Sequence, residues 1–428
     1  MIKKLCAIAS AVALSSIAYA DTANSSTNNN DMLGNSLTIT TSPLMGNESA
    51  YDGSDLMYAY PSINHDLFLL SIHQQMQDYR ATNNITTNKP IMVISGGVEG
   101  GYVAHSQYEG STQYSTSLNT AELDIAAFLN DWAQAFMSYD YQDMPSSSGT
   151  RDPQNEIYLS RGYATIGNLS KSPIYASIGQ MYVPFGRYNS LMLTTTETTS
   201  LARILSTTTV LGFSQNGFSA QAFTYNTQQG EQNSFINEGG ANISYSSTDS
   251  SHPYQIGASY TTNISDSQGM QDNGSDAAFQ GFAINDYDSP STPAYDLYGS
   301  MGIGDFTLIG EYISATKHFS DDALQFNDTG AKPKALQAEL DYSTTINNKP
   351  TSFGIMFSQT WQALALNLPK NSYNVVANTS IWRDTVESIE YSYNTNYGDT
   401  DTSTGAGKAG PSGGGHSNVI TAQLGVYF

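Results

Sequence analysis

Cysteine is almost absent from this sequence: Cys6 is the only one among 428 residues. It lies in the apolar stretch of a predicted signal peptide over residues 1–20, which ends in the small-x-small cleavage site Ala18-Tyr19-Ala20. We expect cleavage after Ala20, and the cysteine is then lost with the signal. The mature chain would have no disulfide, no thiolate metal site and no cysteine nucleophile.

Basic residues are scarce as well. Lys and Arg number 16 against 38 Asp and Glu, which gives a formal net charge of −22. Once Lys3 and Lys4 leave with the signal, 14 basic residues face 38 acidic ones and the charge is −24. A chain of this charge repels a phosphate backbone, so we expect no nucleic-acid partner.

Long apolar runs are also lacking. After residue 20 no stretch approaches the roughly 20 apolar residues that a membrane helix needs. The chain instead ends in NVITAQLGVYF, which puts Phe428, Val426 and Leu424 on one face of a strand and Tyr427 and Gln423 on the other. A secreted chain whose strands have one apolar face fits a closed barrel in the outer membrane of a Gram-negative bacterium. Such a barrel would contact outer-membrane lipid and engage the barrel-insertion machinery through its terminal aromatic strand.

The character of the sequence changes twice along the chain. Residues 21–50 are rich in Asn, Ser and Thr and predict a disordered polar lead-in. Residues 51–90 predict a short helical segment, in which Leu67 and Leu70 share a helical spacing behind the cap-like cluster 64–66. This helix either enters the lumen as a partial plug or extends into the periplasm. Residues 91–428 follow a period of two and predict an all-β, transmembrane antiparallel barrel.

Turn signals organise the barrel region. Asn130-Asp131, Gln215-Asn216-Gly217 and Gly302–Asp305 predict short periplasmic turns between alternating runs. Longer polar stretches at 140–155, 265–293 and 397–417 are typical of extracellular loops. Residues 191–213 can form one strand with a loop or two strands, so the count is fourteen or sixteen, and we predict sixteen.

Two glycine-rich segments need an interpretation. ISGGVEGGY has neither a following helix pattern nor a phosphate-binding lysine, so it indicates a bulge or a close approach of strands instead of a phosphate cradle. GKAGPSGGGH predicts a flexible loop.

Residues for catalysis do not form a pattern. None of the six histidines stands in a motif with a serine, and neither G-x-S-x-G nor H-E-x-x-H occurs. We therefore expect no enzyme, no cofactor and no metal site.

The few basic residues gather in one region of the chain. Lumen arginines can bind an anionic solute through charge-assisted hydrogen bonds, which makes these residues candidates for substrate binding. The alternative is that they pair with lumen carboxylates and stiffen the wall. The group comprises Arg151, Arg161, Lys171, Arg187 and Arg203, of which the last four are the predicted substrate-binding residues.

Several segments resemble the LbtU family of siderophore porins: PSINHDLFLLSIHQQ, ISGGVEG, YLSRGYATIGNLSKSPIYASIGQMYVPFGRY and the terminal QLGVYF. The resemblance covers residues 51–428, and its most specific part is Tyr158–Tyr188. It implies an outer-membrane barrel that takes up iron as a ferric siderophore or a similar small anionic iron complex, and that lacks the plug domain of energised receptors. Relatives have a Gln- and Leu-rich coiled-coil segment where this chain has its polar lead-in.

Two functions follow from these observations. The first is facilitated diffusion of an iron-loaded solute through the barrel. The second is a barrel that mainly displays its long polar loops for adhesion or envelope integrity.

Overall fold

A computed structural model describes residues 38–40, 63–82, 90–106, 108, 112–144, 154–227, 236–247, 252–274, 277–287, 291–382 and 384–428. The predicted signal peptide, nearly all of the polar lead-in and Arg151 lie outside these residues. Within the described ranges, no helix is long and apolar enough to cross a membrane.

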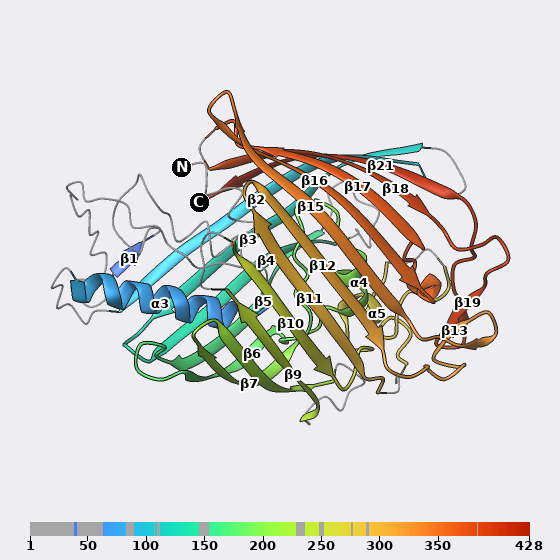
Figure 1. The fold of residues 1–428 in the computed structure, drawn as a ribbon. Helices are drawn as coiled ribbons and strands as arrows, with labels where there is room; N and C mark the ends of the chain where they lie inside the picture. Colours follow the sequence, from blue (N-terminus) through green and yellow to red (C-terminus); the bar gives the residue numbers. More distant parts are fainter. Residues whose placement is uncertain are drawn as a thin grey trace.

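The described strands build one closed antiparallel barrel (Figure 1). Each wall strand pairs with the next wall strand along the chain, and the first pairs with the last, which closes the ring. The wall has sixteen strands, as predicted. They are β2 (Ile91–Ser106), β3 (Thr112–Phe128), β4 (Ala133–Met144), β5 (Gln154–Gly167), β6 (Ile174–Tyr182), β7 (Leu205–Gln215), β8 (Phe218–Asn226), β9 (Ile236–Ser246), β10 (Tyr254–Thr261), β11 (Ala294–Ile303), β12 (Phe306–Ala315), β15 (Lys334–Ile346), β16 (Lys349–Trp361), β17 (Asn371–Thr379), β18 (Thr385–Thr395) and β21 (His416–Tyr427).

The end of the chain completes the ring. Phe428 donates its backbone N–H to the carbonyl of Gly96 at 3.0 Å and accepts the Gly96 N–H at 2.9 Å. Beyond this point β1 (Thr38–Thr40) pairs in parallel with Ile91–Val93 at the start of β2. A Cβ at Gly96 would come within 2.9 Å of the Phe428 ring, so glycine is what allows the two strands to close together.

The terminal strand alternates as predicted. Ile420, Leu424 and Val426 are 45%, 47% and 46% exposed, whereas Thr421 between them is 6% exposed. The other wall strands repeat this arrangement, with Leu, Ile and aromatic side chains outside and polar side chains inside. The outer surface therefore matches a hydrocarbon phase and the inner surface a wet lumen.

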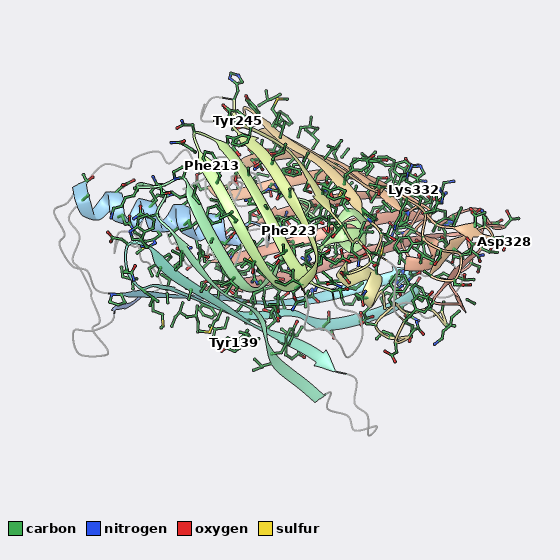
Figure 2. The ribbon with its side chains drawn as sticks, turned by 90° about the horizontal axis from the view of Figure 1, so that it is seen from below. Tyr139, Phe213, Phe223, Tyr245, Asp328 and Lys332 are labelled. Carbon is green, nitrogen blue, oxygen red and sulfur yellow. The ribbon has the colours of Figure 1, made fainter. Side chains whose placement is uncertain are left out.

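Aromatic pairs mark both rims of the outer surface. At the end with the short turns, the rings of Phe306 and Tyr342 lie 4.9 Å apart; at the other end, those of Tyr295 and Tyr312 lie 6.1 Å apart. Figure 2 shows Phe213 near the short-turn end as well. Two such girdles are expected where a barrel meets the two membrane interfaces.

The predicted short turns are in place. β3 and β4 are joined through residues 129–132, and β7 and β8 through Asn216 and Gly217, which have positive φ of 54° and 80°. β11 and β12 are joined through Gly304, with a φ of 60°. Asn347 and Asn348 form a further two-residue turn, with φ of 50° and 62°, that the sequence analysis missed.

The long loops at the opposite end pack into an ordered cap. Strands from two of these loops pair with each other and form a second sheet of four short strands, separate from the barrel wall. This sheet lies beside the labels β13 and β19 in Figure 1. The segment GKAGPSGGGH, predicted as a flexible loop, contributes the two-residue strand β20 to this cap and is otherwise a loop up to the start of β21, whose flexibility stays a prediction. Its glycine-rich backbone packs closely, since Gly413 donates to the Asp401 carbonyl at 3.1 Å. The cap strands are β13 (Leu324–Phe326), β14 (Thr329–Gly330), β19 (Ser403–Gly405) and β20 (Lys408–Ala409), beside the 3-10 helix η2 (Leu364–Leu366).

Two further segments depart from or match the expectations. Residues 191–204 are not a strand, because β7 begins only at Leu205. The chain before β7 forms a loop that contains the short helix α4 (Glu197–Ala202). A second short helix, α5 (Gln268–Gln271) from a neighbouring loop, packs against α4. In β2 the pairing with β3 shifts between Glu99 and Gly100, which confirms the bulge predicted for ISGGVEGGY.

Helix α3 (His65–Thr82) lies against the inner wall near the short-turn end (Figure 1). Leu69, Ile72 and Met76, which share a helical spacing, are at most 2% exposed and pack on inward apolar residues of β2–β6. Towards its carboxyl end, Gln77 donates to the Asp131 carbonyl at 3.1 Å in the β3–β4 turn. The helix therefore starts inside the barrel and ends beside the short turns.

Candidate channel and its constriction

The loop between β6 and β7, residues 183–204, folds into the lumen; we call it the constriction loop. It begins with Val183 and Phe185, both fully buried, and ends with α4, whose amino end is capped by Thr196 accepting from the Thr199 N–H. α4 packs on the inner faces of β12, β15 and β16 and on α5. The loop thus crosses the barrel interior instead of extending into solvent.

Carboxylates on the wall hold the backbone of this loop. Glu311 on β12 accepts the N–H of Arg187 at 2.6 Å and that of Tyr188 at 3.1 Å. Glu339 on β15 accepts the Leu191 N–H at 2.6 Å. Glu390 on β18 accepts from the backbone of residues 193 and 194 and from the Thr194 hydroxyl. Hydrogen bonds to a carboxylate are stronger than ordinary backbone pairs when the carboxylate is ionised.

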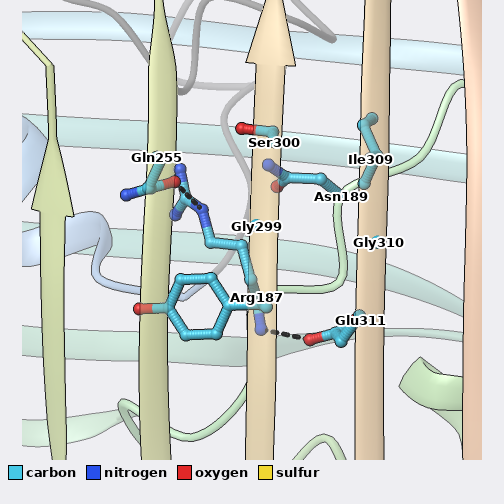
Figure 3. A pocket seen from close by; sticks show the side chains of 9 residues that line it. Arg187, Asn189, Gln255, Gly299, Ser300, Ile309, Gly310 and Glu311 are labelled. Atoms are coloured by element: carbon cyan, nitrogen blue, oxygen red, sulfur yellow. Dashed lines mark hydrogen bonds between the residues drawn. The ribbon is translucent and has the colours of Figure 1, made fainter.

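Arg187, a residue of this loop, has its side chain enclosed between the loop and the wall (Figure 3). Its Nε donates to Gln255 Oε1 on β10 at 3.1 Å, and the residue is only 4% exposed. The cavity beside it, lined also by Tyr298 and Glu311, measures about 10 Å³. That volume admits at most a water molecule, so no iron complex fits beside Arg187 in this arrangement.

The other predicted binding residues are dispersed. Arg161 on β5 is 6% exposed, forms an ion pair with Glu122 and lies 3.6 Å from an Asp124 oxygen. Lys171 pairs with Asp131 at 2.9 Å in a short turn, far from the loop. The structure therefore does not bring Arg161, Lys171 and Arg187 together, and each has an acidic or polar partner of its own.

Arg203 is placed differently from the rest of that group. It ends α4, its guanidinium lies 4.7 Å over the Tyr182 ring, and its Nε donates to Gln268 at 3.1 Å. Its side chain remains partly exposed. The role of Arg203 and of the other three residues as substrate ligands stays a prediction.

Two buried carboxyls lie in the elements that fill the lumen. Burial raises the pKa of Glu197 in α4, against the opposing effect of a hydrogen bond donated by Ser358. Burial likewise raises the pKa of Asp66 in α3, where Ser177 donates to Oδ2 at 2.6 Å. Both elements thus have a carboxyl whose ionisation is disfavoured by burial.

Sequence reasoning missed the constriction loop and its wall carboxylates. The run LMLTTTETTSLARILSTTTVLGF mixes apolar residues and threonine as a strand does, which obscured where β7 begins. The inward positions of Glu311, Glu339 and Glu390 in otherwise apolar strands were the available signal. Their partners lie 123–197 residues away along the chain, so no local pattern links them.

Solved structures share this architecture. The anion-selective porin of Comamonas acidovorans superposes with a TM-score of 0.53 at 10% identity, covering 79% of this chain and 100% of that one. The outer-membrane channel DcaP of Acinetobacter baumannii gives 0.52 at 9% identity, with 79% and 97% covered. At such identities the likeness establishes the fold: this is a porin-like barrel of the Gram-negative outer membrane.

Sequence relatives define the family more closely, although no family model matches the chain. The UPF0422 protein of Legionella pneumophila strain Lens is 36% identical over 410 residues, 91% of this chain and 76% of the relative. The UPF0422 protein of Coxiella burnetii is 35% identical over 397 residues, 90% and 83% of the two chains. The chain belongs to the UPF0422 family.

Proposed function

We propose that this protein is a passive outer-membrane channel through which a small iron-loaded solute, with a ferric siderophore as the first candidate, enters the periplasm. The observation that carries the channel function is a polar lumen narrowed by a loop whose backbone is fixed to wall carboxylates. A constriction held in this way can select a solute while still releasing it, which facilitated diffusion requires.

The iron part of the proposal rests on the resemblance to the LbtU family of siderophore porins. The most specific segment of that resemblance, Tyr158–Tyr188, covers most of β5, all of β6 and the first residues of the constriction loop. The segment therefore includes wall and constriction together. Its likeness to siderophore porins supports iron uptake as the task of this channel.

The test is iron uptake in a strain from which the gene is deleted. Radiolabelled iron is supplied either as a ferrous salt or bound to the organism's own siderophore, and uptake is compared before and after the intact chain is restored. We expect deletion to lower uptake of at least one form and the restored chain to recover it. Equal uptake of both forms with and without the protein contradicts the iron assignment.

The ordered extracellular cap favours a second candidate, the display of loops for adhesion or envelope integrity. Replacing residues 397–417 by a short Asn-Gly turn removes β19 and β20 from the cap sheet. Lost surface binding with normal iron uptake supports display, and lost uptake with normal surface binding supports transport. An unboiled sample that still migrates differently from a boiled one shows that the variant barrel has folded.

A further inference from the structure

The accessible charge of the lumen wall is acidic over three neighbouring strands. Glu122 on β3 is paired in register with Asp140 on β4 and with Gly97 on β2, two residues before Glu99. We call Glu99, Glu122 and Asp140 the acidic wall. The three residues therefore lie on adjacent strands: Glu122 is directly opposite Asp140, and Glu99 is offset from this pair by two residues along β2.

These side chains face the lumen. Their chain neighbours Val98 and Leu123 are 46% and 38% exposed on the outer surface, so the alternate positions point inwards. Glu99 accepts a hydrogen bond from the Tyr427 hydroxyl at 2.7 Å, and Asp140 one from Ser138 at 3.2 Å. None of the three is fully enclosed by protein, and Glu122 is paired with Arg161, so a solute in the lumen meets the unpaired charges of Glu99 and Asp140.

Within the described residues, Arg161 forms an ion pair with Glu122, whereas Glu99 and Asp140 have no ion pair. Arg161 is buried beside Glu122 and Asp124, and the Arg187 side chain is enclosed between the constriction loop and the wall, whereas Arg203 is only partly exposed over Tyr182. The lysines of the described residues lie in turns, loops, the cap or the first positions of wall strands. They are Lys171, Lys317, Lys332, Lys334, Lys349, Lys370 and Lys408.

The middle of the constriction loop is neutral where it is accessible. The longest accessible run of this loop, Ser190–Thr195, has no ionisable side chain, whereas Tyr188 and Arg203 elsewhere in the loop are half-buried. The carboxylates that hold this part, Glu339 and Glu390, are each 1% exposed and have the loop backbone in front of them. By strand order, β10, β11 and β12 lie across the ring from β2, β3 and β4.

We propose that the channel prefers cations, and that its cargo is a cationic or neutral solute instead of an anionic iron complex. This inference rests on the proposed channel function and specifies its substrate class. Carboxylates on a low-dielectric wall concentrate counter-ions and repel anions. The same fold serves an anion-selective porin in Comamonas acidovorans, so the preference must come from the lumen side chains of each chain.

The experiment measures the reversal potential of the purified full chain in a planar bilayer across a KCl gradient. We expect K⁺ to permeate about tenfold better than Cl⁻. Neutralising two members of the acidic wall, in the double variant Glu99→Gln with Asp140→Asn, leaves the ion pair of Arg161 with Glu122 in place. This variant should lower the permeability ratio by at least about twofold. The matched control Asp328→Asn, on an exposed cap loop, should leave the ratio unchanged.

The outcomes separate this inference from the channel function. A conducting wild-type chain that prefers Cl⁻, or a double variant with an unchanged ratio, overturns the inference and leaves the channel function standing. Absence of any conductance overturns both. In cells, faster uptake of ferrous iron than of a negatively charged ferric citrate complex supports the inference, and the reverse order contradicts it.

Discussion

At the residue scale, inward carboxylates perform two different tasks on one wall. Glu311, Glu339 and Glu390 accept hydrogen bonds from the loop backbone and are almost completely buried. Glu99 and Asp140 remain accessible to the lumen. An inward acid in a barrel strand is therefore informative only together with its partner: a buried one fixes a loop, and an accessible one sets the charge of the channel.

The loop-fixing task can be tested at Glu311. Glu311→Ala leaves the N–H groups of Arg187 and Tyr188 without their acceptor, and hydrogen bonds to a charged group contribute about 1.5–3 kcal/mol each. We expect a looser constriction loop, seen as larger fluctuations in single-channel current. Glu311→Gln keeps an acceptor oxygen and should show a smaller effect; equal effects from both variants would contradict the role of the acceptor.

A pH dependence follows from Glu197. Burial raises the pKa of this carboxyl, so in the folded-in loop it is protonated at pH values at which a released loop would be ionised. The stabilisation of the folded-in loop is therefore complete below the ordinary glutamate pKa of about 4.3 and is lost as the pH rises through the folded-state value. Amide hydrogen exchange across residues 197–203, corrected for intrinsic rates, should show greater protection in acid.

The control for this pH effect is Glu197→Gln, which cannot ionise. Protection of α4 in that variant should no longer vary with pH, while Asp328→Asn on an exposed loop should behave as the wild type. A Glu197→Gln chain whose protection keeps the wild-type pH dependence assigns the effect to another group.

At the element scale, α3 is held in the lumen by the apolar side chains that it buries. Leu69 is 0% exposed, and truncating such a side chain costs about 2–5 kcal/mol. We expect Leu69→Ala to increase hydrogen exchange of α3 and to raise the channel conductance, since the helix narrows the mouth near the short turns. Asp78→Ala changes an exposed position of the same helix and should do neither. Unchanged exchange in Leu69→Ala contradicts this packing role.

The elements also show how far the sequence could predict the fold. Strand β2 begins at Ile91, where the period of two begins, and β21 alternates to the end of the chain, because side-chain alternation is a local property. The constriction loop could not be predicted in this way. Its position depends on wall carboxylates more than a hundred residues distant, and the cap sheet depends on strands of two or three residues from different loops.

The candidate site was predicted less well than the barrel, for a physical reason. The basic residues near one another in sequence are separated by the strand geometry: Arg161 and Lys171 occupy a strand and a short turn, and Arg187 lies in the loop. Scarcity of positive charge in an acidic chain indicated functional importance, yet the described arginines have polar, acidic or aromatic partners within the fold. Arg161, beside Glu122 and Asp124, illustrates that outcome.

At the scale of the whole molecule, stability depends on two surfaces with opposite requirements. The outer band must be apolar over a hydrocarbon thickness of about 30 Å, and the inner surface must satisfy polar groups without lipid. Ile355, in the middle of β16, is 54% exposed on the outer band, whereas Ser117 on β3 lies on the lumen side and is also exposed. Both side chains are exposed, but Ile355 is exposed to lipid and Ser117 to the water of the lumen.

A charge placed at each position distinguishes the two surfaces. Ile355→Arg puts a guanidinium near the bilayer midplane and should cost about 2–4 kcal/mol, whereas Ser117→Arg adds the same side chain to the wet lumen and should cost little. The measurement is the fraction of protein that folds into lipid vesicles, read from the mobility difference between unboiled and boiled samples. The Ile355→Arg chain should fold in a smaller fraction than Ser117→Arg under the same conditions. Similar yields for the two variants would show that β16 does not face lipid, and the assignment of outside and inside would have to be reversed for that part of the wall.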